Sequence, residues 1–162
     1  MASFFEEFSD RLPPGRLFEV LDWLFDDRRF SPSVWGRGER AKFTKRIKKL
    51  DGFGDMSFGY KSKKLVYPRL PSEQSHLKKT YAVFSKQLGS QGADFVRHIR
   101  NGIAHGHASL YTVGSNTFIE IRDYGRGGTP SAFIAMPAAF ISDTLDIYRR
   151  IEQEVSSKGA EE

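Results

Sequence analysis

The chain has 162 residues, of which 39% are hydrophobic and 22 are aromatic (14 Phe, 6 Tyr and 2 Trp), a composition typical of one packed globular domain. It contains no cysteine, which excludes disulfides, thiolate nucleophiles and cysteine zinc sites, and no apolar run approaches the roughly 20 residues of a membrane span. The 25 Lys and Arg residues against 20 Asp and Glu give a net charge of +5, which suits an anionic partner without requiring one.

Three helices are predicted in the first fifty residues. Apolar residues from Phe4 to Leu12 recur with helical spacing, and Pro13-Pro14-Gly15 ends that helix. The same spacing recurs from Leu17 to Phe25. A third helix is expected from about Glu39 to Leu50, with Phe43 and other apolar residues facing the core.

This third helix and its start are strongly basic. Glu39 stands against seven cationic residues: Arg37, Arg40, Lys42, Lys45, Arg46, Lys48 and Lys49. Two interpretations remain open, a solvated helix face or an electrostatic track for a nucleic-acid backbone. Under the second interpretation, the candidate RNA-binding residues are Arg40, Lys45, Lys48 and Lys49.

The connection from Asp51 to Pro71 is rich in Gly, Pro and aromatic residues, with a possible short strand at Leu65–Tyr67. Aromatic side chains lie close to three lysines that are further RNA-binding candidates, Lys61, Lys63 and Lys64. Such aromatics could stack on unpaired bases, or they could simply pack the loop against itself. Ser72 is then expected to cap a fourth helix carrying Leu77, Tyr81, Phe84 and Leu88.

The next helix has an unusual polar side. At about 100° per residue, Phe95, Val96, Ile99 and Ile103 share one face, and Gly106 occupies the C′ position beyond the helix end. The opposite face is predicted to hold Arg97, His98, Asn101 and His105, with Arg100 at its edge. Imidazole exchanges protons near neutral pH and guanidinium binds phosphate oxygens, so this face has the groups needed to act on a phosphodiester.

The stretch Arg100-Asn101-Gly102-Ile103-Ala104-His105 resembles the Arg-Asn-x-x-x-His signature of HEPN domains, which are helical RNA- and nucleotide-handling domains of prokaryotic toxin and antiviral-defence systems. The resemblance implies a metal-independent endoribonuclease without a cofactor, acting as a homodimer with the motif helices near the two-fold axis. An inhibitor protein is a further candidate partner. HEPN toxins silenced by nucleotide transfer carry Tyr two residues after the His, whereas this chain has His107.

Metal-free RNA cleavage by the 2′-hydroxyl needs a proton acceptor, a proton donor and positive charge at the phosphorane, and it leaves 2′,3′-cyclic phosphate and 5′-hydroxyl ends. We assign proton transfer to His105 and binding of the phosphate and its transition state to Arg100, with Asn101 orienting either His105 or the phosphate. Three auxiliary candidates are also open to interpretation as ordinary surface residues: Arg97, His98 and His107.

Three alternatives stay open. The same Arg and Asn could hold a phosphate in a non-catalytic module that binds RNA, a nucleotide or a protein. The histidines could instead be buried in a purely structural subunit. A metal site is disfavoured, because His98 and His105 are about two turns apart, whereas two ligands of one zinc ion on a helix favour i, i+4 spacing.

After Gly106 the residue pattern changes to that of strands. Ser109–Val113 and Thr117–Asp123 flank Gly114-Ser115-Asn116, a hairpin signal, and residues 132–136 are a possible third strand. Pro137 is expected to open a last helix reaching Val155. The fold class predicted is therefore mainly α, a bundle of about five helices with a small β-hairpin or three-stranded meander before the last helix.

We expect a single domain over residues 1–162, with 156–162 as a frayed tail. Glu6, Glu7 and Asp10 among the N-terminal phenylalanines are unlike a signal peptide, so a cytoplasmic protein with no membrane partner is expected.

Overall fold

The computed structural model describes residues 3–26, 35–50, 58–60, 80–86 and 89–161. Within these residues, five α-helices accompany a five-stranded mixed sheet. The predicted helical bundle with a small hairpin is therefore wrong, and the fold class is mixed α/β. The strands that the sequence prediction treated as a hairpin or meander are part of a larger sheet that also contains β1 and β2.

The three N-terminal helices agree with prediction. They are α1 (Phe4–Asp10), α2 (Arg16–Leu24) and α3 (Arg37–Lys48). Ser3 caps α1 by accepting a hydrogen bond from the Glu6 N–H. The Glu39 carboxylate accepts the Gly36 N–H at 3.0 Å, which fixes the start of α3.

The sheet has the strand order β1-β2-β5-β4-β3. Its strands are β1 (Phe58–Tyr60), β2 (Tyr81–Phe84), β3 (Ala108–Val113), β4 (Asn116–Tyr124) and β5 (Pro130–Pro137). Only the β1–β2 pair is parallel. β3 and β4 form the predicted hairpin, with Gly114 at φ +62° in its turn, and the predicted third strand is the central strand β5.

The predicted fourth helix is wrong where the structure describes it, because Tyr81–Phe84 is a strand. Ala82 and Phe84 are buried while Val83 between them is half-buried, which is strand alternation. Pairing with β5 on one side and β1 on the other provides hydrogen-bond partners for the backbone N–H and C=O groups of this strand. Ser72, Leu77 and Leu88, and the proposed strand at Leu65–Tyr67, lie outside the described residues.

The motif helix is α5 (Gln91–Ala104), and the last helix is α6 (Ala139–Glu161). A short 3₁₀ turn, η1 (Arg126–Gly128), joins β4 to β5. α6 continues through residues 156–161, where a frayed tail was expected. Among the described residues, no helix combines the length and the apolar character that crossing a membrane requires.

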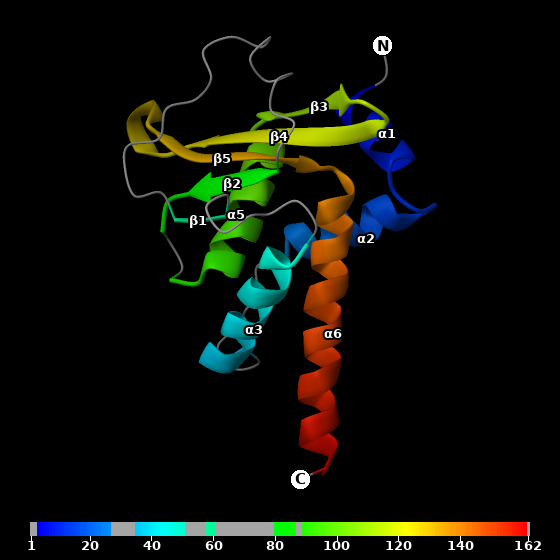
Figure 1. Cartoon of the computed structure of the whole chain (residues 1–162), viewed down its shortest axis with the longest axis vertical. Helices are drawn as coiled ribbons and strands as arrows, with labels where there is room; N and C mark the ends of the chain where they lie inside the picture. The colour runs from blue at the N-terminus through cyan, green and yellow to red at the C-terminus, as the bar shows by residue number, and fades with distance from the viewer. Residues whose placement is uncertain (1–2, 27–34, 51–57, 61–79, 87–88, 162) are drawn as a thin grey trace.

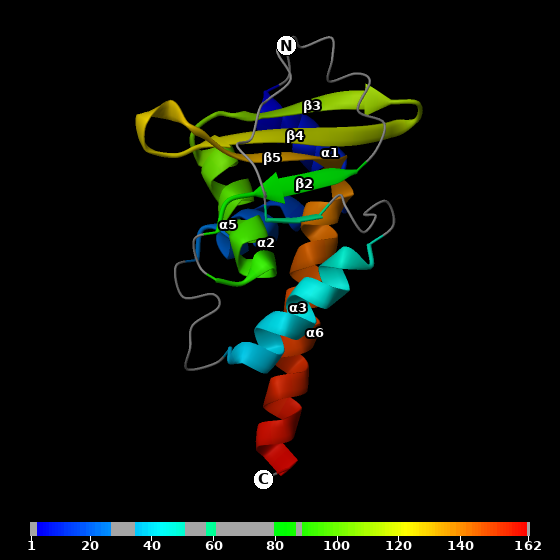
Figure 2. The same cartoon turned by 60° about the vertical axis from the view of Figure 1, so that its left-hand side comes forward.

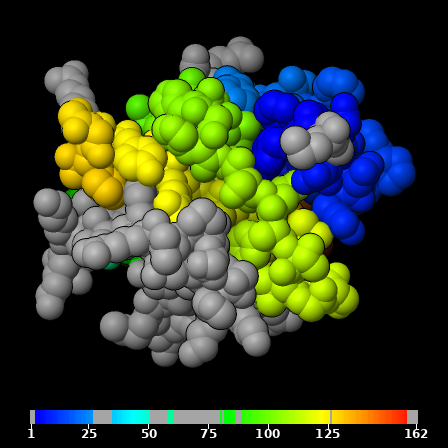
Figure 3. Space-filling view, turned by 90° about the horizontal axis from the view of Figure 1, so that it is seen from above, coloured from blue at the N-terminus to red at the C-terminus, as the bar shows by residue number. Residues whose placement is uncertain are grey.

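The helices α2, α3, α5 and α6 gather on one side of the sheet, as Figures 1 and 2 both show, while α1 lies beside the β3 edge. Seen from above in Figure 3, the chain from the end of α5 through the β3–β4 hairpin lies on the surface next to α1. Between sheet and helices, Phe84 and Phe95 pack against Phe58, and Trp35 stacks on Tyr148 of α6 with ring centroids 4.6 Å apart. This core holds α5 against the sheet.

Candidate functional site

The exposed side of α5 carries most of the motif. Arg97, Ala104 and His105 are exposed, and Arg100 and Asn101 are half-buried. The apolar face predicted for Phe95, Val96, Ile99 and Ile103 is buried, as expected. The helix therefore presents a polar stripe that ends at His105.

The end of α5 has a defined geometry. His105 is the C-cap residue, Gly106 follows with φ +73°, and the N–H groups of Gly106 and His107 donate to the carbonyls of Ile103 and Gly102 at 3.2 and 2.8 Å. This is the double hydrogen-bond pattern of a Schellman motif, so the prediction of Gly106 as a C′ glycine is confirmed. The His107 carbonyl also accepts the Arg122 N–H at 3.1 Å, which ties the helix end to β4.

Two exposed imidazoles result from this geometry. The ring centroids of His105 and His107 lie 6.3 Å apart. The His107 ring also packs edge-to-face on Tyr124, with centroids 5.0 Å apart. Both histidines are exposed, so both rings are accessible to a bound ligand.

Arg100 and Asn101, which precede His105 on α5, form a connected pair. Arg100 Nη1 donates to Asn101 Oδ1 at 3.1 Å, and the guanidinium lies over the Phe25 ring at 5.5 Å. Arg100 Nε is buried without a hydrogen-bond partner among the described residues. Asn101 Nδ2 in turn donates to Asp123 Oδ2 at 3.3 Å. Asn101 thus links the guanidinium to a carboxylate on β4.

The structure corrects the prediction for His98. It is fully buried rather than on an exposed polar face, because the ends of β2 and β4 cover it. Its Nδ1 lies 2.7 Å from Asp123 Oδ2, and its Nε2 lies 3.1 Å from the Ser85 carbonyl. Both ring nitrogens thus lie within hydrogen-bond distance of an oxygen, one of a carboxylate and one of a backbone carbonyl. His98 is therefore not available to a substrate.

Asp123 is the site residue that sequence reasoning missed. Burial raises its pKa, but hydrogen bonds from His98, the Tyr124 N–H and Asn101, together with the charge of His98, outweigh burial and lower the pKa below its ordinary value. The signal was present in the sequence, because Asp123 follows Ile119 and Ile121 at every second position and so shares their inward face of a predicted strand. A carboxylate at such a position needs a buried partner.

Gly102 lies inside α5 because the helix touches the sheet there. A Cβ at this position would clash with Ile121 Cγ2. The close contact is thus with β4 of the same chain. The smallness of Gly102 gives no support to close approach of a second motif helix.

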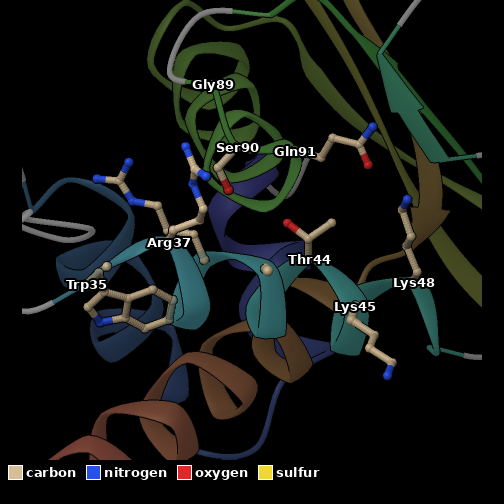
Figure 4. A pocket seen from close by; sticks show the side chains of 11 residues that line it. Trp35, Arg37, Thr44, Lys45, Lys48, Gly89, Ser90 and Gln91 are labelled. Atoms are coloured by element: carbon tan, nitrogen blue, oxygen red, sulfur yellow. The ribbon is translucent and has the colours of Figure 1, made fainter.

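The predicted RNA-binding residues are divided between two surfaces. Arg40, Lys45 and Lys48 line a groove of about 790 Å³ between α3 and the start of α5, which Figure 4 shows from close by. Lys49 lines a different surface, between α3 and α6. The other candidates, Lys61, Lys63 and Lys64, lie outside the described residues.

Comparison with known proteins adds no assignment: no family model, no curated protein and no solved structure matches the sequence. Among the described residues, no three His, Asp or Glu side chains are grouped so that they could hold a metal ion. The site is therefore interpreted from its own geometry.

Proposed function

We propose that this chain is a metal-independent endoribonuclease, acting in the cytoplasm, whose proton-transfer groups are His105 and His107. The observation that carries the proposal is the pair of exposed imidazoles, 6.3 Å apart between centroids, at the fixed end of α5. Two such groups on one chain can serve one phosphodiester, one as the base and one as the acid.

The reaction balances with these groups alone. One imidazole takes the proton of the 2′-hydroxyl as that oxygen bonds to phosphorus. The bond from phosphorus to the 5′-oxygen breaks, and the other imidazole, as imidazolium, donates a proton to the departing oxygen. The products are a 2′,3′-cyclic phosphate and a 5′-hydroxyl, with one proton accepted and one donated.

Arg100 supplies the positive charge for the phosphorane. Its guanidinium is oriented by the Phe25 ring and by Asn101, and Asn101 is held by Asp123. Asn101 is therefore assigned as a positioning residue for Arg100, which differs from the role of orienting His105 or the phosphate that the sequence suggested. Arg97, exposed on the same stripe, keeps its auxiliary role in phosphate attraction.

The Arg-Asn-x-x-x-His resemblance to HEPN endoribonucleases supports the same chemistry, and it carries with it the proposal of a toxin or antiviral-defence role with a possible inhibitor protein. The all-helical architecture is not part of the proposal. A homodimer stays a prediction that the chemistry does not need, because His107 provides the second imidazole within one chain.

The test is cleavage of an end-labelled single-stranded RNA by the purified chain in EDTA, beside an all-deoxy strand of the same sequence. We expect the RNA to give 2′,3′-cyclic phosphate ends and the deoxy strand to survive, because it lacks the nucleophile. Cleavage of the deoxy strand, or activity that EDTA removes and a divalent ion restores, would contradict the mechanism. Binding without cleavage would favour a non-catalytic RNA-binding module.

A further inference from the structure

A second surface of the molecule has the features of a binding site, at the opposite end of α5 from the imidazoles. One face of α3 and the first residues of α5 enclose the groove of about 790 Å³. In Figure 4, Arg37, Thr44 and Lys48 extend from α3 toward the side where Ser90 and Gln91 begin α5, and Lys45 turns outward at the edge.

The charge of this groove is positive along its length. Arg37 and Lys48 are exposed, and neither forms an ion pair with any carboxylate in the part of the chain that the structure describes. They stand eleven residues apart on one helix, which is roughly 16 Å along its axis. Arg40 and Lys45 line the groove between them. A row of cations of this length matches a chain of phosphates better than a single phosphate group.

Carboxylates near the groove are engaged elsewhere. Glu39 caps the start of α3 through the Gly36 N–H, and Asp94 is buried and accepts the Tyr60 hydroxyl at 2.8 Å. Neither of these carboxylates lines the groove. The groove therefore keeps its positive potential.

Two other cationic residues of α3 join this helix to α6 instead of lining the groove. Lys42 and Arg46 reach the opposite side of the helix, where both bind the Glu154 carboxylate of α6 at 3.2 and 2.9 Å. The helix thus has one face where Lys42 and Arg46 pair with α6, and another where Arg37 and Lys48 form no ion pair among the described residues. The basic residues of α3 therefore form two groups, one that binds α6 and one that faces the groove.

The residues at the beginning of α5 form one side of the groove. Gly92 N–H donates to Thr44 Oγ1 at 2.9 Å, which joins α5 to α3 at the groove floor. The side chain of the N-cap residue Ser90 makes no capping hydrogen bond to the first turn of α5. The positive end of the helix dipole therefore reinforces the cations of α3.

We propose that this groove binds the phosphodiester backbone of a single-stranded nucleic acid, at a site roughly 20 Å along α5 from the imidazole pair. The inference rests on the proposed function only in identifying that strand with the RNA substrate. The groove holds the strand, and the far end of α5 cuts it.

The experiment measures binding of a fluorescein-labelled all-deoxy oligonucleotide by anisotropy over a series of salt concentrations, with a probe that the proposed reaction cannot cleave. The groove variant is Arg37→Gln/Lys48→Gln. Its matched control is Arg11→Gln/Arg150→Gln, which removes the same charge from two exposed positions outside the groove. Circular dichroism melts check that both variants fold like the wild type.

The groove variant should bind several-fold more weakly, and the slope of log K against log salt should shrink by about 0.7 for each lost phosphate contact. The control should bind like the wild type. Equal losses in both variants, or no loss in the groove variant, would overturn the proposal. So would competition by a free nucleoside triphosphate as strong as that by the unlabelled strand. Groove-dependent binding without cleavage of the RNA version would instead sink the proposed function and leave this inference standing.

Discussion

His98 and His105 are both histidines that belong to the same helix. They lie at nearly the same angle around its axis, because a separation of seven residues leaves them only about 20° apart. Yet one is fully buried between two acceptors and the other is exposed at the helix end. The sheet makes the difference. The ends of β2 and β4 cover His98, whereas His105 caps the helix. Periodicity defines a face, and the neighbouring elements decide which part of it meets solvent.

The largest effect on stability should come from breaking the buried pair. His98→Ala leaves the Asp123 carboxylate buried without its main partner, so we expect a loss of about 3–5 kcal/mol in the free energy of unfolding. His105→Ala should change it by less than about 0.5 kcal/mol. Urea denaturation measures both.

A double-mutant cycle sharpens this contrast. If the two groups act as a pair, His98→Ala/Asp123→Ala should be more stable than the sum of the two single losses allows. Additive losses, or a His98→Ala variant as stable as the wild type, would show that the buried pair is not the anchor described here.

A smaller loss is expected at the contact between α5 and β4. Gly102→Ala places a methyl group against Ile121, and relief of that contact should cost about 1–3 kcal/mol of unfolding free energy. Ala104→Ser, on the exposed stripe two residues later, is the control and should stay near wild type. A Gly102→Ala variant of unchanged stability would mean that the helix and strand are not in close contact.

Asp123→Asn tests the same pair through pH. Because the folded pKa of Asp123 is lowered below its ordinary 3.8, its ionised form stabilises the fold above that value, and the contribution is lost as pH falls through the lower folded pKa. The wild type should therefore be more stable than Asp123→Asn at neutral pH, and the gap should shrink in acid. A gap that stays constant down to about pH 3 would contradict an ionised, paired Asp123.

The smallest effect is expected when the protein is diluted and its RNA-cleavage activity per chain is measured. If one chain supplies both imidazoles, activity per chain should not change as a dimer is diluted into monomers, with mass measured by light scattering at each concentration. A composite site across a two-fold axis predicts that activity falls with the dimer population. Mixed dimers of wild-type and His105→Ala chains would then lose far more than half of their activity.

Local features of the chain were predictable. The helical repeats before residue 50, the hairpin at Gly114-Ser115 and the C′ role of Gly106 all follow from spacing and glycine conformation. The strand at Tyr81–Phe84 was not predictable, because Leu77, Tyr81, Phe84 and Leu88 recur with helical spacing. This segment is a strand because it pairs with β5 and β1.

The site was predictable in its residue types and only partly in its arrangement. Arg100, Asn101 and His105 lie on the exposed side, as spacing indicated. The burial of His98 depends on Asp123, 25 residues away in the chain, and no helical periodicity contains that contact. The proximity of His107 to His105 depends on a turn at Gly106, which periodicity likewise does not describe.

The central claim is that His105 and His107 are two proton-transfer groups of one site. The most direct measurement is the rate of RNA cleavage against pH for the wild type, His105→Ala and His107→Ala. We predict a bell-shaped wild-type profile, and for each variant the loss of one limb with a rate reduced by roughly 10²- to 10⁴-fold. A bell that persists in both variants, or a His107→Ala chain that cleaves at the wild-type rate, would contradict the claim.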